Sequence, residues 1–155
     1  MRLFELLGGW VESVDDSTAK MLLDRHSQHH AWRASQWWDR LPVVASIDRE
    51  TLVTPASPGL EAACVLLART SEPVDRLAGV YRVLVPRLLV SYRAHRVAAS
   101  PASDAPVIRT LEHVTKDQAD DWLEGEALVQ RLMVTSAQVS DVALIVSRLE
   151  TTLLS

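Results

Sequence analysis

Two histidines four residues apart, His26 and His30, have the type and the spacing that could hold a metal ion. This spacing places two side chains on one face of an α-helix, so both imidazoles could face the same ion, with His29 as a substitute. Two imidazoles do not complete a metal site, so further ligands would have to come from other helices. The donors available for that role are His95, Glu112, His113, Asp117 and Asp121. His26, His30 and Asp121 together would give the two-histidine, one-carboxylate pattern of non-haem iron.

The same residues could instead form a buried polar network that holds no metal, and this is the interpretation we favour. In that network Arg33 and Asp121 would form a bidentate ion pair, with the histidines hydrogen-bonded around it. Such a network would fix the register of the helices while adding little net stability, because desolvating the charges offsets their attraction. A further alternative leaves His29 and His30 partly at the surface. The residues expected in the polar core, or as ligands, are His26, His30, Arg33, His95, Gln118 and Asp121.

Two predicted helices must position these side chains. The first runs from Asp16 to Leu41, with N-cap candidates at its start and Pro42 after its end. The second starts near Ala105, after a turn and just before Pro106. Residues at alternating spacings of four and three predict its core-facing stripe, and the middle of that stripe is polar. The stripe consists of Val107, Leu111, Val114, Gln118, Asp121, Gly125, Leu128 and Leu132.

The rest of the chain predicts further helices and no strand. Residues 2–7 form a short helical strap that Gly8 and Gly9 should stop, and residues 42–58 form a crossing loop with one turn near 47–52. Two helices follow over residues 59–70 and 72–98, the second kinked but not broken at Pro86. The last helix should present one apolar face, formed by Val139, Val142, Ile145, Val146, Leu149 and Leu153. We therefore expect one domain over residues 1–155, an all-α bundle with four main helices.

Three stretches resemble small ferritin-like proteins of actinobacterial type. They read HHAWRASQWWDRLP, YRVLVPRLLVSYRAH and VIRTLEHVTKDQADDWLEGEALVQ, and the resemblance covers about residues 21–132. It implies a ferritin-like four-helix bundle with a short N-terminal helical strap and a kinked second helix. That family holds two irons with a glutamate and a histidine three residues later on two helices, plus one glutamate from each of the others. No glutamate here is followed three residues later by histidine, and Gln118 and Asp121 have the matching positions.

The resemblance therefore implies a degenerate di-iron site and a non-catalytic binding or assembly protein without a cofactor. One alternative is a metal-dependent oxidase or hydroxylase that uses iron or manganese in a histidine-rich site. Another is a small-molecule binding domain with a cavity at the polar middle of the bundle. We expect Tyr81 to be a core residue whose hydroxyl reaches a polar partner.

Composition and charge limit the partners. The chain has 155 residues, a formal net charge of -4 and scattered arginines, so no nucleic-acid partner is expected. It has one cysteine and no apolar run long enough for a membrane span, which favours a cytoplasmic protein. Trp37 and Trp38 point about 100° apart on a helix and cannot share one core. We therefore expect Trp32 and Trp38 at an interface, most simply that of a homodimer, with any small-molecule or protein partner unidentified.

Overall fold

The computed structural model describes residues 2–54 and 57–154, and this part of the chain is helical and contains no strand. The all-α class predicted from the sequence is therefore confirmed. The α-helices are α1 (Arg2–Trp10), α2 (Ser17–Trp38), α3 (Pro58–Arg69), α4 (Pro73–Ala78), α5 (Val85–Ala98), α6 (Ala105–Leu132) and α7 (Ser136–Leu153). Two short 3-10 turns, Val11–Ser13 and Arg49–Leu52, and a π-helical segment, Gly79–Leu84, complete the elements.

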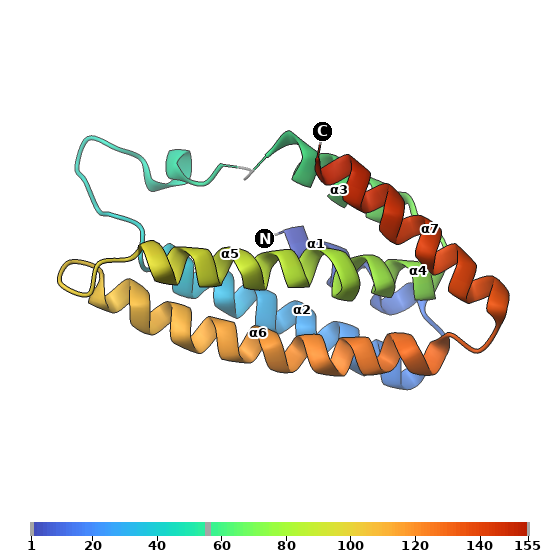
Figure 1. Cartoon of the computed structure of the whole chain (residues 1–155). Helices are drawn as coiled ribbons and strands as arrows, with labels where there is room; N and C mark the ends of the chain where they lie inside the picture. Colours follow the sequence, from blue (N-terminus) through green and yellow to red (C-terminus); the bar gives the residue numbers. More distant parts are fainter. Residues whose placement is uncertain (1, 55–56, 155) are drawn as a thin grey trace.

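Three long helical rods form the body of the molecule (Figure 1). They are α2, the continuous helix from α4 through the π-helical segment to α5, and α6, which contacts both of the others. Helix α1 packs on α2, while α7 packs against α3, α4 and the π-helical segment. Figure 1 shows α7 slanting away from α5 as it approaches the C-terminus. The bundle is thus closed at the end where α4 begins and more open toward the end of α5.

Local sequence signals set most helix starts. The Asp16 side chain accepts a hydrogen bond from the Ala19 backbone N–H over 2.7 Å and so caps α2, as predicted. Thr135 and Gln138 form a capping box at the start of α7. Helix α2 ends at Trp38, three residues before the predicted Leu41, because the chain turns there with i to i−3 hydrogen bonds. The turn Arg49–Leu52 lies within the predicted 47–52, whereas residues 55–56 of that loop fall outside the described residues.

The helix from Pro73 to Ala98 passes through Pro86 without a break, as predicted. Its irregularity is the π-helical segment Gly79–Leu84, which ends two residues before the proline. Proline has no backbone N–H, so a local change from the i to i−4 pattern removes the conflict with the preceding turn. The π-helical segment also contains Tyr81, a fully buried side chain.

A glycine allows this helix to lie close to α6. A Cβ atom at Gly125 would overlap the ring of Tyr81, so the ring packs directly on the α6 backbone. Gly125 lies on the predicted stripe of α6, whose other members from Leu111 to Leu128 are buried as expected. The two outer members, Val107 and Leu132, are half-buried.

Two expectations were wrong. Gly8 and Gly9 do not stop the first helix, because α1 buries Leu6, Leu7 and Trp10 and this packing outweighs a helix penalty of about 1 kcal/mol per glycine. Val139, expected on the apolar face of α7, is 53% exposed. It lies in the first turn of α7, at the end of the bundle, where the chain has only just turned back from α6 (Figure 1).

Candidate functional site

A cluster of polar side chains lies inside the molecule between α2, α6 and the π-helical segment. We call it the polar cluster and define it by six residues, all less than 9% exposed: His26, His30, Arg33, Tyr81, Gln118 and Asp121. Helical spacing explains why α2 contributes three of them, since residues 26, 30 and 33 are separated by four and three positions. Gln118 and Asp121 share a face of α6 for the same reason. The structure thus brings five of the six predicted residues to one place.

Asp121 is the centre of this cluster. Arg33 donates from Nη2 to Asp121 Oδ2 over 2.6 Å, and both side chains are nearly excluded from solvent. The other carboxylate oxygen, Oδ1, lies 2.8 Å from His29 Nδ1 and 3.5 Å from His26 Nε2. The predicted Arg33–Asp121 pair is therefore present, but through one guanidinium nitrogen and not two. The carboxylate has already used both of its oxygens in contacts within the protein.

His26 connects this centre to the second rod of the bundle. Its Nδ1 atom lies 2.7 Å from the hydroxyl oxygen of Tyr81, while its Nε2 atom faces Asp121 and, at 3.4 Å, Glu124. The imidazole thus joins α2, the π-helical segment and α6. Sequence analysis anticipated a polar partner for the Tyr81 hydroxyl but did not identify it, because the pair is 55 positions apart along the chain.

Burial sets the protonation states of the histidines. Burial lowers the pKa of His30 to about 3, and the positive charge of Arg33 acts in the same direction. Burial also lowers the pKa of His26, against the opposing effect of Asp121. For Asp121, burial opposes ionisation, but His26, Arg33 and His29 outweigh it and lower the pKa of the carboxyl group. At neutral pH the cluster therefore holds neutral His26 and His30 beside a carboxylate and a guanidinium.

Several buried polar atoms of the cluster have no hydrogen-bond partner among the protein atoms described. These atoms are His30 Nε2, Arg33 Nε, Arg33 Nη1 and both side-chain amide atoms of Gln118. Buried polar groups in folded proteins are nearly always hydrogen-bonded, to protein or to ordered water. The hydrogen bonds of the cluster thus involve Asp121 or His26, while His30 and Gln118 contribute none of those described.

The cluster does not fit a metal ion of the ferritin-like type. Di-iron sites in such bundles use several carboxylates to balance the positive charge of the ions. The polar cluster has one carboxylate, and its closest partner is a guanidinium that carries a fixed positive charge. Across residues 2–54 and 57–154, no group of three or more histidine, cysteine or acidic side chains is arranged to hold a metal ion.

His95 is not part of the cluster. It is exposed near the end of α5, where its ring stacks on Trp37 with centroids 5.9 Å apart. Because α5 continues from the π-helical segment, the 14 positions between residues 81 and 95 correspond to about 21 Å along the axis. Periodicity placed His95 on a helix correctly but gave no information about its height relative to His26.

Two other residues near the cluster were missed. Arg25 and Glu124 form an exposed ion pair between α2 and α6, beside His26. Position 124 is three residues after Asp121, so the helical spacing of these two acidic residues was a signal that both face α2. The side chain of Glu124 is half-exposed, at the edge of the cluster.

The two tryptophans expected at an interface lie near the C-terminal end of α2. Trp32 is 46% exposed. Trp38 is 37% exposed, and the Arg49 guanidinium lies 4.7 Å from its ring centroid, so the loop after α2 partly covers it. The exposure of Trp38, next to the half-buried Trp37, agrees with the geometric argument that these two adjacent side chains cannot share one core.

Comparisons with known proteins do not assign the chain to a family. In the part of the chain that the structure describes, no helix is long and apolar enough to cross a membrane. No protein-family model, no curated protein and no solved structure matches this chain.

Proposed function

We propose that the protein is a ferritin-like four-helix bundle that lacks the di-iron ligand set and acts as a non-catalytic binding or assembly protein. The observation that carries this proposal is the contact between Arg33 and Asp121, at 2.6 Å. It puts a permanent cation against the buried carboxylate that a metal ion would need. The neutral histidines beside it supply no negative charge to compensate for an added divalent ion.

Support for the ferritin-like part of the proposal comes from the long helices and from the presence of one long connection. Residues 39–72, which include α3, connect α2 to the long helix that begins at Pro73. Ferritin-like bundles likewise contain one long crossover connection, although in this chain it joins the first main helix to the second. The four main helices of the proposed bundle are α2, the helix Pro73–Ala98, α6 and α7.

Metal analysis tests the proposal. Protein produced with added iron and manganese and purified without a chelator should contain far less than one metal ion per chain. The His26→Ala variant and a control variant, His113→Ala, should show the same low content, since His113 is exposed on α6 and outside the polar cluster. Stoichiometric iron or manganese in the parent protein and in His113→Ala, but not in His26→Ala, would overturn the proposal in favour of a metalloenzyme.

We also propose that the assembly formed is a homodimer. Support comes from apolar side chains on α5, where Val90 is 64% and Val97 88% exposed. Helix α7 slants away from this part of α5, so a second copy could cover it (Figure 1). Sedimentation velocity at micromolar concentration should give the mass of two chains, and Val90→Glu should return the protein to monomers. A parent protein that is monomeric throughout this range would contradict the homodimer.

A further inference from the structure

Helices α2 and α6 are joined by polar contacts over only part of their length. Toward the start of α2 they are joined by the Arg25–Glu124 pair, and at the polar cluster by contacts of Asp121. Beyond the cluster, no described hydrogen bond or ion pair joins residues 34–38 of α2 to residues 105–117 of α6. There α2 is joined to α5 instead, because Trp37 contacts Tyr92 and His95. At this end the polar contacts of α2 are therefore made with α5 and not with α6.

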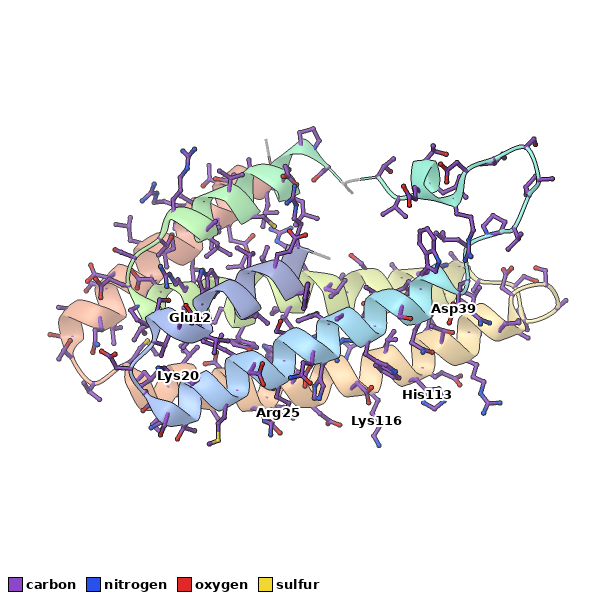
Figure 2. The ribbon with its side chains drawn as sticks, turned by 180° about the vertical axis from the view of Figure 1, so that it is seen from behind. Glu12, Lys20, Arg25, Asp39, His113 and Lys116 are labelled. Carbon is purple, nitrogen blue, oxygen red and sulfur yellow. The ribbon has the colours of Figure 1, made fainter. Side chains whose placement is uncertain are left out.

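A groove of about 730 Å³ lies between α2 and α6 at this end. We call it the Trp32 groove; it is lined by Trp32, Gln36 and Arg40 from α2 and its end, and by Ala105, Pro106, Arg109, Thr110 and His113 from α6. Figure 2 views the molecule from the side where α2 and α6 lie next to each other, with Asp39 and His113 labelled near this end. The volume is within the range of about 300–1,000 Å³ that small-molecule sites occupy.

The charge of the groove selects for an anion. No aspartate or glutamate lines it, whereas Arg40 and Arg109 do. The guanidinium groups of Arg40 and Arg109 form no hydrogen bond or ion pair with the residues that the structure describes. In contrast, seven other arginines pair with carboxylates in the same chain: Arg2, Arg25, Arg33, Arg82, Arg87, Arg96 and Arg131. Arg40, in the turn after α2, and Arg109, on α6, are thus left to bind an external negative charge.

A second groove makes a useful contrast. It lies on the other side of α6, has a volume of about 480 Å³ and shares Arg109 and His113 with the Trp32 groove. Its other arginine, Arg96, lies 3.7 Å from Glu112, which also lines it. This carboxylate offsets the charge of Arg96, so the second groove has less positive charge than the Trp32 groove.

Trp32 adds a preference for a ligand with a planar apolar group. Its indole is almost half-exposed and lines the groove beside the arginines. Aromatic rings stack on indole, and guanidinium groups also pack on planar π-systems. We propose that the Trp32 groove binds a small organic anion with an aromatic ring, whose negative group pairs with Arg40 and Arg109 while its ring packs on Trp32. This inference rests on the proposed binding function and specifies its ligand class.

Titration with naphthalene carboxylate, followed by calorimetry and by chemical-shift changes of backbone amides, tests this assignment. The expected Kd is about 1 mM or tighter, with shifts confined to the groove residues. The neutral naphthalene methanol and the non-aromatic cyclohexane carboxylate should each bind about 10-fold more weakly, because each lacks one of the two recognition elements. Added salt should weaken the binding of both carboxylates and leave the binding of the alcohol unchanged.

Variants locate the site. Arg40→Gln and Arg109→Gln should each lower the affinity for naphthalene carboxylate about 5- to 10-fold. Trp32→Leu should give naphthalene carboxylate and cyclohexane carboxylate equal affinities, because the ring of the ligand then has no indole to pack on. The matched control is Arg148→Gln, since Arg148 is exposed on α7, away from the groove. Circular dichroism should confirm that all four variants fold.

Two results would overturn the assignment. One is binding of naphthalene carboxylate that is absent at about 5 mM or equal in all variants. The other is a loss of self-association in the Arg40→Gln, Arg109→Gln double variant, which would make the groove an interface between copies. Neither result depends on metal content, so failure of this inference is distinguishable from failure of the proposed absence of a metal site.

Discussion

Arg33 on α2 and Asp121 on α6 form a buried ion pair at 2.6 Å, with 2% and 6% of their side-chain surfaces exposed. The pair crosses between two long helices at the height of His26 and Gln118, where an apolar bundle would have hydrophobic contacts. Removing one partner of a buried ion pair is costly, because the other charge stays in a poorly solvating environment.

The first prediction concerns the ion pair. Arg33→Met should lower the free energy of unfolding by about 3–5 kcal/mol, because it leaves the Asp121 carboxylate buried without its cation. The double variant Arg33→Met, Asp121→Leu should recover most of this loss, since neither charge remains. Urea denaturation measures both values.

The exposed pair Arg25–Glu124 joins the same two helices and provides the control. Arg25→Met should cost less than about 1 kcal/mol, as expected for a pair that is half in solvent. Equal effects of Arg33→Met and Arg25→Met would show that Arg33 is not a buried charge partner.

The second prediction concerns pH. The pKa of His30 is about 3 in the folded protein and about 6.5 in the unfolded chain, so only the unfolded chain takes up this proton between those values. The free energy of unfolding should therefore fall as pH falls below about 6.5, by about 1.4 kcal/mol per pH unit for this residue. His26, whose pKa is also lowered by burial, acts in the same direction. The lowered pKa of Asp121 likewise gives stability that is lost on acidification.

Urea unfolding curves measured between pH 7 and pH 5 test this slope. His30→Leu should reduce the slope by the contribution of one proton, whereas His113→Leu, at an exposed site, should leave it unchanged. A parent protein whose stability does not vary over this range would show that the two histidines are accessible to solvent protons.

The third prediction concerns the contact between His26 and Tyr81. Tyr81→Phe keeps the ring and removes the hydroxyl that lies 2.7 Å from His26 Nδ1. Because His26 is fully buried, its Nδ1 atom would lose a partner that water cannot easily replace. The free energy of unfolding should therefore fall by about 1–3 kcal/mol. Tyr92→Phe is the comparison, since the Tyr92 hydroxyl makes only a long contact of 3.4 Å with Trp37. This variant should lower the free energy of unfolding much less. Thermal or urea denaturation that ranks the two variants in the opposite order would refute this role of Tyr81.

The fourth prediction concerns Gly125. A methyl group there would overlap the Tyr81 ring, so Gly125→Ala should force the two rods apart and cost about 1–3 kcal/mol despite the better helix propensity of alanine. Gly9→Ala, also in a helix, meets no atom within 4 Å and should raise stability by about 0.5–1 kcal/mol. If Gly125→Ala is as stabilising as Gly9→Ala, the close packing of Tyr81 on α6 is wrong.

The sequence by itself determined the elements. Capping residues and prolines such as Asp16, Thr135 and Pro106 act through the nearest backbone groups, so helix starts can be inferred without knowledge of the fold. The polar interruption of the α6 stripe, at Gln118 and Asp121, was visible for a similar reason, because a spacing of three residues fixes a common face. The all-α class and the buried position of these two residues follow from such local rules.

Only the tertiary structure decided which side chains meet. Asp121 faces Arg33 and His29, His26 reaches Tyr81, and His95 lies beside Trp37 instead. These pairings depend on the rotation and the axial offset of one helix relative to another. The close approach permitted by Gly125 and the π-helical segment helps to set both quantities, through contacts between residues far apart in the chain. Periodicity within a single helix contains no information about them, and for that reason the spacing of His26 and His30 alone did not distinguish a metal site from a polar network.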